Sequence, residues 1–296
     1  MYQLRDYQQV LINQTLKAFK DYKKVLMTAP TGAGKTILAD YLISRVFTDK
    51  KIFFVCNREE LVKQSAQKFS CDVGIVKAGM ESEMDLTKRV QIIMINTYHA
   101  RKDRLELPNP DLVIIDEAHQ FDFKKKMTAG LIESIGHDAR YLGMTATPMS
   151  ERGYALEGWD TIIDDVQIRD LQKSGWLVKE KWFVGDEVDL SNVSVKNGDY
   201  QTGELSEEMR KATVIENVYE NYEKLSKNKK TMVFATDIAH AEELNKAFTR
   251  KGYEPFVIHS KMENPEMRPE FIERFTNKKD GILINVLALT TGFDEP

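Results

Sequence analysis

Hydrophobic residues in the first half of the chain alternate between short continuous runs and helical spacing. Five apolar runs have the length of strands and cover residues 25–28, 52–56, 91–95, 112–115 and 141–144. Apolar positions three and four residues apart predict helices around 7–18, 35–47 and 58–69, the last with Asn57 as its N-cap. Apolar strands separated by amphipathic helices are typical of a parallel sheet covered on both faces, so we predict an α/β domain.

The second half shows the same alternation of strand and helix patterns after a less regular stretch. We expect strands at 231–235, 256–258 and 281–286, and helices at 239–248, which follows Asp237, and 265–275. Asn197-Gly198 between apolar residues suggests a β-hairpin turn. The expected organisation is a first domain at 1–165, a connecting region with the hairpin at 166–225, and a second α/β domain at 226–296, whose three strands make it incomplete.

Composition narrows the class of protein. With 42% hydrophobic and 30% charged residues, the 296-residue chain resembles ordinary globular proteins of about two domains. No apolar stretch approaches the ~20 residues that span a bilayer, and the N-terminus lacks a secretory core, so we expect a cytoplasmic protein without a membrane partner. The net charge of -4 argues against nucleic-acid binding over the whole surface, but not against a local basic groove. The lysine run at 124–126 fits a solvated face better than a phosphate track, and both interpretations stay open.

A candidate phosphate-binding turn lies between the first apolar strand and the helix that follows it. Its sequence, APTGAGKT at 29–36, has alanine where the general pattern has a first glycine. Backbone N–H groups of such a turn surround phosphates, its lysine reaches the β- and γ-phosphates, and its hydroxyl residue binds Mg²⁺. The residues predicted to bind the nucleotide here are Pro30, Thr31, Gly32, Ala33, Gly34, Lys35 and Thr36. We therefore expect ATP and Mg²⁺ as ligands.

A second motif predicts hydrolysis. The apolar run at 112–115 ends in Asp116 and Glu117, and ligands of parallel sheets bind at the carboxyl ends of the strands. Asp116 is placed to hold Mg²⁺ together with Thr36, and Glu117 to orient and deprotonate the attacking water. The predicted catalytic residues are thus Glu117, Lys35 and Asp116.

With these motifs in place, the chain from Leu4 to Pro296 resembles the superfamily 2 helicases. The resemblance is to the DEAH-type group that includes phage and bacterial DNA helicases and type III restriction subunits. It rests on segments in the family's order: LRDYQQ at 4–9, the turn at 29–36, NREELVKQ at 57–64, NTYH at 96–99, DEAH at 116–119, GMTATP at 143–148, VFAT at 233–236, IHS at 258–260 and TTGFD at 290–294. The fold that it implies is two RecA-like P-loop NTPase domains with parallel sheets, the second incomplete.

The resemblance also implies roles for residues that the chemistry alone does not assign. It places Arg5 and Gln8 on the base, Gly292 and Asp294 on the nucleotide, His119, Thr145 and Thr147 in coupling, and Asn57, Arg58, Thr97, Thr236, His259 and Thr291 on the nucleic-acid backbone. Taken alone, each short motif also has an ordinary structural explanation, such as a helix cap, a strand end or a plain loop.

The function implied is an ATP-dependent helicase or translocase acting on nucleic acid, DNA in preference to RNA. The family's final arginine motif does not occur within the 296 residues. We therefore expect a continuation or a partner chain to supply it, and slow hydrolysis without it. Two alternatives stay open: a nucleotide-gated nucleic-acid-binding module with weak ATPase activity, and the motor subunit of a restriction enzyme.

Overall fold

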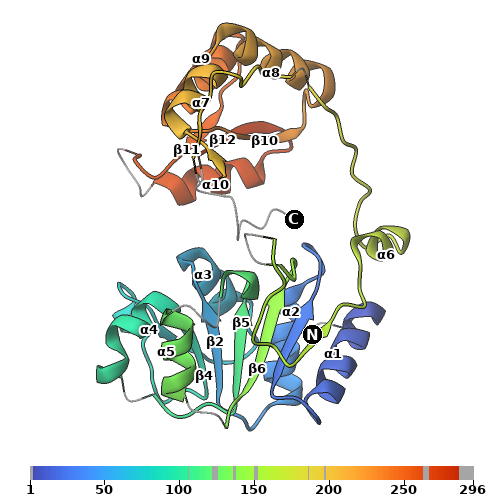
Figure 1. Cartoon of the computed structure of the whole chain (residues 1–296), viewed down its shortest axis with the longest axis vertical. Coiled ribbons are helices and arrows are strands. Elements are labelled where there is room, and N and C mark those ends of the chain that lie inside the picture. The colour runs from blue at the N-terminus through green and yellow to red at the C-terminus, as the bar shows by residue number, and fades with distance from the viewer. Residues whose placement is uncertain are drawn as a thin grey trace. The chain divides into compact units, whose positions relative to one another are not determined.

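The computed structural model divides the chain into two compact units, Met1–Glu180 and Lys181–Pro296, each built around its own parallel sheet (Figure 1). The structure describes residues 3–105, 107–121, 126–135, 138–149, 153–185, 187–196, 198–262 and 267–286. Within these ranges, no helix combines the length and the hydropathy needed to cross a bilayer.

The described residues of the first unit form a sheet of seven parallel strands in the order β3-β4-β2-β5-β6-β1-β7. They are β1 (Lys24–Thr28), β2 (Ile52–Cys56), β3 (Gly74–Val76), β4 (Val90–Met94), β5 (Leu112–Asp116), β6 (Arg140–Thr145) and β7 (Thr161–Ile163). The helices are α1 (Asp6–Ala18), α2 (Lys35–Tyr41), α3 (Glu59–Lys68), α4 (Ile95–Arg101), α5 (Lys126–Ile135) and α6 (Ile168–Lys173). Short turns of other helix types are the π-helix η1 (Leu42–Val46) and the 3₁₀ turns η2 (Glu81–Glu83), η3 (Lys102–Arg104) and η4 (Ala118–Gln120).

Alternate residues of the central strands enter two different cores, as the two-residue period of a strand requires. Met27 and Phe54 pack with α1, α2 and α3 on one face of the sheet. Leu26 and Val55 pack with α4 and α5 on the other face. Every residue of β2 and β5 is buried. Continuous apolar runs therefore mark the centre of the sheet because both faces are covered.

The predicted strands of the first half are all present, and the α/β fold is confirmed. Three details differ from the prediction. Asn57 is not an N-cap, because α3 begins at Glu59 and Arg58 holds the cap position. The helix predicted over 35–47 changes to a π-helix at Leu42. The edge strands β3 and β7 were not predicted, because each has only three residues.

In the second unit, the part of the chain that the structure describes forms a three-stranded parallel sheet in the order β10-β12-β11. Its elements are α7 (Thr202–Met209), α8 (Ala212–Leu225), β10 (Lys230–Phe234), α9 (Ile238–Arg250), β11 (Phe256–Ile258), α10 (Met267–Asn277) and β12 (Gly281–Asn285). Helices α8 and α9 lie on one side of this sheet and α10 on the other (Figure 1). The predicted hairpin is present as β8 (Val195–Lys196) and β9 (Asp199–Tyr200), with Asn197 outside the described residues. Asp237, which the sequence places just before this helix, is the N-cap of α9, since its carboxylate accepts from the backbone N–H of His240 at 2.8 Å.

Candidate active site

The turn at residues 29–34 connects β1 to α2. It begins with a hydrogen bond from Ala29 N to Thr145 O at 2.9 Å, which ties the end of β1 to the end of β6. Gly32 and Gly34 have φ angles of 79° and 82°, in the left-handed region that favours glycine. Lys35 and Thr36 then form the first turn of α2, where a helix presents free N–H groups and a positive dipole end. The turn therefore has the conformation and the position of an anion site.

Two side chains of α1 donate hydrogen bonds to the backbone of this turn. The Gln8 amide donates from Nε2 to Ala33 O at 3.0 Å, and the Tyr7 hydroxyl donates to the same oxygen at 3.0 Å. Gln8 is only 3% exposed, and its Oε1 accepts from Arg5 N at 3.0 Å. A Cβ on Gly34 would lie 2.7 Å from Gln8 Nε2, so a side chain there would displace the Gln8 amide from Ala33 O as well as strain the backbone at this φ. Besides its predicted role on the base, Gln8 thus supports the phosphate turn.

Glu117 and Lys35 meet at the carboxyl edge of the sheet. Lys35 Nζ lies 3.8 Å from Glu117 Oε1, and both side chains are largely buried. Glu117 has a φ of 49°, which is uncommon for a residue with a side chain and is a feature of functional sites. The predicted phosphate-binding lysine and the predicted general base therefore share one site.

Asp116 is the residue of this site whose pKa is clearly shifted. It is 7% exposed, and burial together with the neighbouring Glu117 raises its pKa from 3.8 to about 6, while Lys35 opposes the rise. The Asp116 carboxylate accepts a hydrogen bond from Glu117 N at 3.0 Å. The surroundings of Asp116 do not compensate the negative charge of its carboxylate, and a cation bound beside it would do so. The Asp116 carboxylate and the Thr36 hydroxyl are oxygen donors of the kind Mg²⁺ prefers, so they fit that ion.

His119 connects this carboxylate pair to the end of β6. Its Nδ1 lies 3.4 Å from Glu117 Oε2 and 3.0 Å from Thr145 Oγ1. Because a carboxylate can only accept, the contact with Glu117 favours the tautomer with the proton on Nδ1. The Thr145 hydroxyl donates to Thr147 O and accepts from Thr147 N, both at 3.0 Å. The three predicted coupling residues therefore form one series of polar contacts that begins at Glu117.

The predicted nucleic-acid contacts of the first unit lie at the ends of two neighbouring strands. Asn57 and Arg58 follow β2, and Asn57 Nδ2 donates to Gln120 Oε1, just after the DEAH segment. Gln120 was not singled out from the sequence, although its place beside that segment was a signal. Thr97 is 7% exposed, lies within α4 and accepts from Ala78 N at 3.1 Å. Asn57 is thus bonded to a residue that directly follows the DEAH segment.

In the second unit, Thr236 and His259 follow β10 and β11 and lie at the carboxyl edge of that sheet. The Thr236 N–H and hydroxyl face His240 Nδ1 at 3.2 and 3.1 Å. Burial lowers the pKa of His240, so its neutral ring accepts from Thr236. His259 Nδ1 accepts from Lys261 N at 3.2 Å. The predicted residues Thr291, Gly292 and Asp294 lie outside the described residues.

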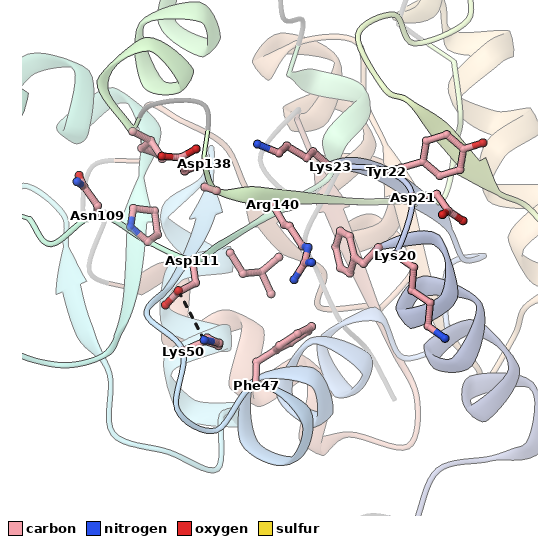
Figure 2. A pocket seen from close by; sticks show the side chains of 15 residues that line it. Lys20, Asp21, Tyr22, Lys23, Phe47, Lys50, Asn109, Asp111, Asp138 and Arg140 are labelled. Atoms are coloured by element: carbon pink, nitrogen blue, oxygen red, sulfur yellow. Dashed lines mark ion pairs between the residues drawn. The ribbon is translucent and has the colours of Figure 1, made fainter.

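A hollow of about 790 Å³ opens at the opposite edge of the first sheet, where the strands begin. Figure 2 shows Lys50 paired with Asp111 and the Arg140 side chain pointing into the hollow. Arg140 Cζ lies 5.8 Å from the centre of the Phe19 ring. Side chains of both charges line it, and the predicted site residues do not belong to its described lining, so we assign it no part in the chemistry.

The parallel sheet, the phosphate turn after β1 and the carboxylate pair after β5 define a P-loop NTPase fold. The family described as "Type III restriction enzyme, res subunit" matches residues 1–150, and "Helicase conserved C-terminal domain" matches residues 210–296. The chain belongs to the type III restriction enzyme res subunit family, within the superfamily 2 helicases. The resemblance seen in the sequence is thereby confirmed.

Individual relatives agree with this assignment. The "51.5 kDa protein" of a Lactococcus phage is 26% identical over 276 residues, covering 92% of this chain and 56% of the relative. The "Putative ATP-dependent helicase IRC3" of Saccharomyces cerevisiae is 27% identical over 320 residues, covering 99% of this chain and 45% of the relative. The chain thus spans about half the length of these curated relatives.

Solved structures share the fold. A fragment of a putative HsdR subunit of a type I restriction enzyme from Vibrio vulnificus has a TM-score of 0.68 and 20% identity, covering 100% of this chain and 56% of the other. Mss116p, solved with ssRNA and AMP-PNP, has a TM-score of 0.61 and 15% identity, covering 99% of this chain and 62% of the other. At these identities the comparison supports the two RecA-like domains and nothing finer.

Proposed function

We propose that this chain is the motor portion of a helicase or translocase that hydrolyses ATP and moves along nucleic acid, DNA in preference to RNA. The observation that carries the proposal is the placement of Lys35 and Glu117 within 3.8 Å of each other at the mouth of the phosphate turn. The family assignment supports the same activity, and the DNA preference rests on the phage and restriction-enzyme relatives.

In the proposed reaction, ATP phosphates replace Glu117 as the partner of Lys35. Glu117 then accepts a proton from a water molecule as the water oxygen bonds to the γ-phosphorus. The bond from the γ-phosphorus to the bridging oxygen breaks, and ADP and phosphate leave. Mg²⁺, held by Asp116 and Thr36, would neutralise charge on the phosphates.

The proposed link from hydrolysis to movement is the series from Glu117 through His119 and Thr145 to Thr147. His119 is close enough to Glu117 to respond when that carboxylate takes a proton. The bond between Asn57 and Gln120 offers a second link, toward a residue proposed to contact the nucleic-acid backbone. Backbone contacts of this kind make binding tolerant of sequence and sensitive to salt.

A panel of nucleic acids tests the proposal. ATPase activity would be measured at one fixed salt concentration with single-stranded DNA, duplex DNA and single-stranded RNA of matched sequence. We expect stimulation by DNA, little change when the base sequence is scrambled, and loss of stimulation as salt rises. Equal rates with and without every nucleic acid would contradict the motor function. Stronger stimulation by RNA would contradict only the DNA preference.

The restriction-enzyme names among the relatives favour a narrower candidate, the motor subunit of a restriction enzyme. Such a motor would translocate on duplex DNA without separating its strands. Displacement of a third strand from a triplex, with no unwinding of a fork substrate, would support this candidate over a helicase.

A further inference from the structure

An aromatic side chain from the segment after α6 lies beside the phosphate turn. Arg5 Cζ lies 4.3 Å from the centre of the Trp176 ring, and the Tyr7 ring centre is 6.4 Å from that of Trp176. Arg5 Nη1 donates to the Tyr7 hydroxyl at 3.3 Å, and this hydroxyl donates to Ala33 O at 3.0 Å. The indole, the guanidinium and the phenol thus form a continuous series of contacts that ends at the turn.

Hydrogen bonds and packing around Trp176 fix its backbone beside α1. Trp176 N and Leu177 N both donate to Leu171 O, at 2.8 and 3.1 Å. Leu171 is 2% exposed and belongs to the core beneath α1 and α2. A Cβ on Gly32 would lie 2.8 Å from Leu177 Cδ2, so Leu177 packs directly on the phosphate turn. The position of Trp176 is therefore set by packing that does not depend on its own ring.

Trp176 remains 45% exposed in spite of these anchors. A tryptophan that served only the core would be covered more completely, because its large apolar surface is what burial stabilises. A planar guanidinium held on an indole has a second face, and nucleobases stack on such planes. The exposed Trp176 ring and the half-buried Arg5 guanidinium together have the shape and polarity of a support for a base.

We propose that Trp176 is a positioning residue of the nucleotide site, which holds the Arg5 guanidinium flat beside the phosphate turn so that a purine base can stack on it. This inference rests on the proposed function and extends it to the base end of the nucleotide. Trp176 does not touch the phosphates, so its loss weakens recognition of the base and leaves the phosphate contacts intact.

The test compares a ligand that has a base with one that lacks it. Dissociation constants for ADP and for inorganic tripolyphosphate would be measured for the whole chain and for Trp176→Ala, Trp176→Phe and Trp182→Ala. Trp182 is the matched control, since it is 87% exposed and belongs to the other unit. We expect Trp176→Ala to weaken the affinity for ADP about tenfold and the affinity for tripolyphosphate less than twofold. In steady-state ATPase assays the same variant should have a raised KM for ATP and an unchanged kcat. Trp176→Phe should recover most of the ADP affinity, and Trp182→Ala should behave as the wild type.

Tryptophan fluorescence gives a second readout that holds even if the alanine variant folds poorly. ADP should change the emission of the wild type and of Trp182→Ala, and should leave Trp176→Phe unchanged. Unaltered ADP affinity in Trp176→Ala, or equal losses for ADP and tripolyphosphate, would overturn the inference while leaving the proposed function standing. If the wild-type chain bound neither ADP nor tripolyphosphate, both the inference on Trp176 and the proposed function would be overturned.

Discussion

Replacing Asp116 with asparagine should stabilise the metal-free protein at neutral pH, although it removes a predicted magnesium ligand. The folded protein holds the Asp116 proton more tightly than the unfolded chain does, because its pKa is raised from 3.8 to about 6. Stability therefore falls as pH rises from about 4 to about 6, and the loss is complete above the folded pKa. This pKa difference corresponds to about 3 kcal/mol at pH 7.5 and to less than about 1 kcal/mol at pH 4. Asparagine has nearly the same shape and keeps an acceptor for Glu117 N, so it removes the charge with little other change.

The assay is urea unfolding of metal- and nucleotide-free protein at both pH values, followed through the transition of the first unit. Asp116→Asn should raise the free energy of unfolding by about 2–3 kcal/mol at pH 7.5 and by less than about 1 kcal/mol at pH 4. Asp138→Asn, an exposed site in the same unit, serves as the control and should change stability by less than about 0.5 kcal/mol. A variant no more stable than the wild type at pH 7.5, or equally stabilised at both pH values, would refute the reasoning.

Three further substitutions test other parts of the structure. Gly143→Ala should cost about 1–3 kcal/mol in urea unfolding, because its Cβ would lie 2.4 Å from the Trp159 ring, and unchanged stability would show that the ring can move aside. Thr145→Val removes the hydroxyl partner of His119, and should lower kcat with nucleic acid about tenfold with little change in the KM for ATP; an equal rise in KM would contradict a coupling role. Tyr7→Phe removes a hydroxyl that donates to Ala33 O in the phosphate turn, and it should weaken ADP binding about fivefold in a direct titration. Unchanged affinity would show that the conformation of the turn does not depend on this hydrogen bond.

The centre of the fold could be predicted because its strands are buried on both faces. The runs at 52–56 and 112–115 contain no polar residue, and the structure places both as strands. The edge strands β3 and β7 could not be recognised, since three residues show no period. The pairing of β7 also depends on β1, which is distant in sequence. The π-helix after α2 likewise has no sequence signature that we recognise.

The core of the candidate site was predictable for a related reason. Carboxyl ends of parallel strands share one edge, so the motifs that follow β1 and β5 are expected at the same edge, where the structure places Lys35 near Glu117. The contact between Asn57 and Gln120 and the place of Trp176 depend on how loops pack, which no local pattern specifies. The environment of Thr97 was not predictable for the same reason. The sequence suggested a strand end, whereas Thr97 lies inside α4 and its hydroxyl accepts from Ala78 N.

Single-turnover ATP hydrolysis by the wild type and by Glu117→Gln tests the central claim most directly. Both proteins would be mixed with limiting radiolabelled ATP, Mg²⁺ and single-stranded DNA, with bound ATP and released phosphate measured in the same samples. Our account predicts equal ATP binding and hydrolysis at least about a hundredfold slower in Glu117→Gln, because glutamine cannot accept the proton of the attacking water. Lys35→Ala, as the companion variant, should lose the binding itself. Hydrolysis by Glu117→Gln at the wild-type rate, or equal loss of ATP binding in both variants, would contradict the assignment of this site.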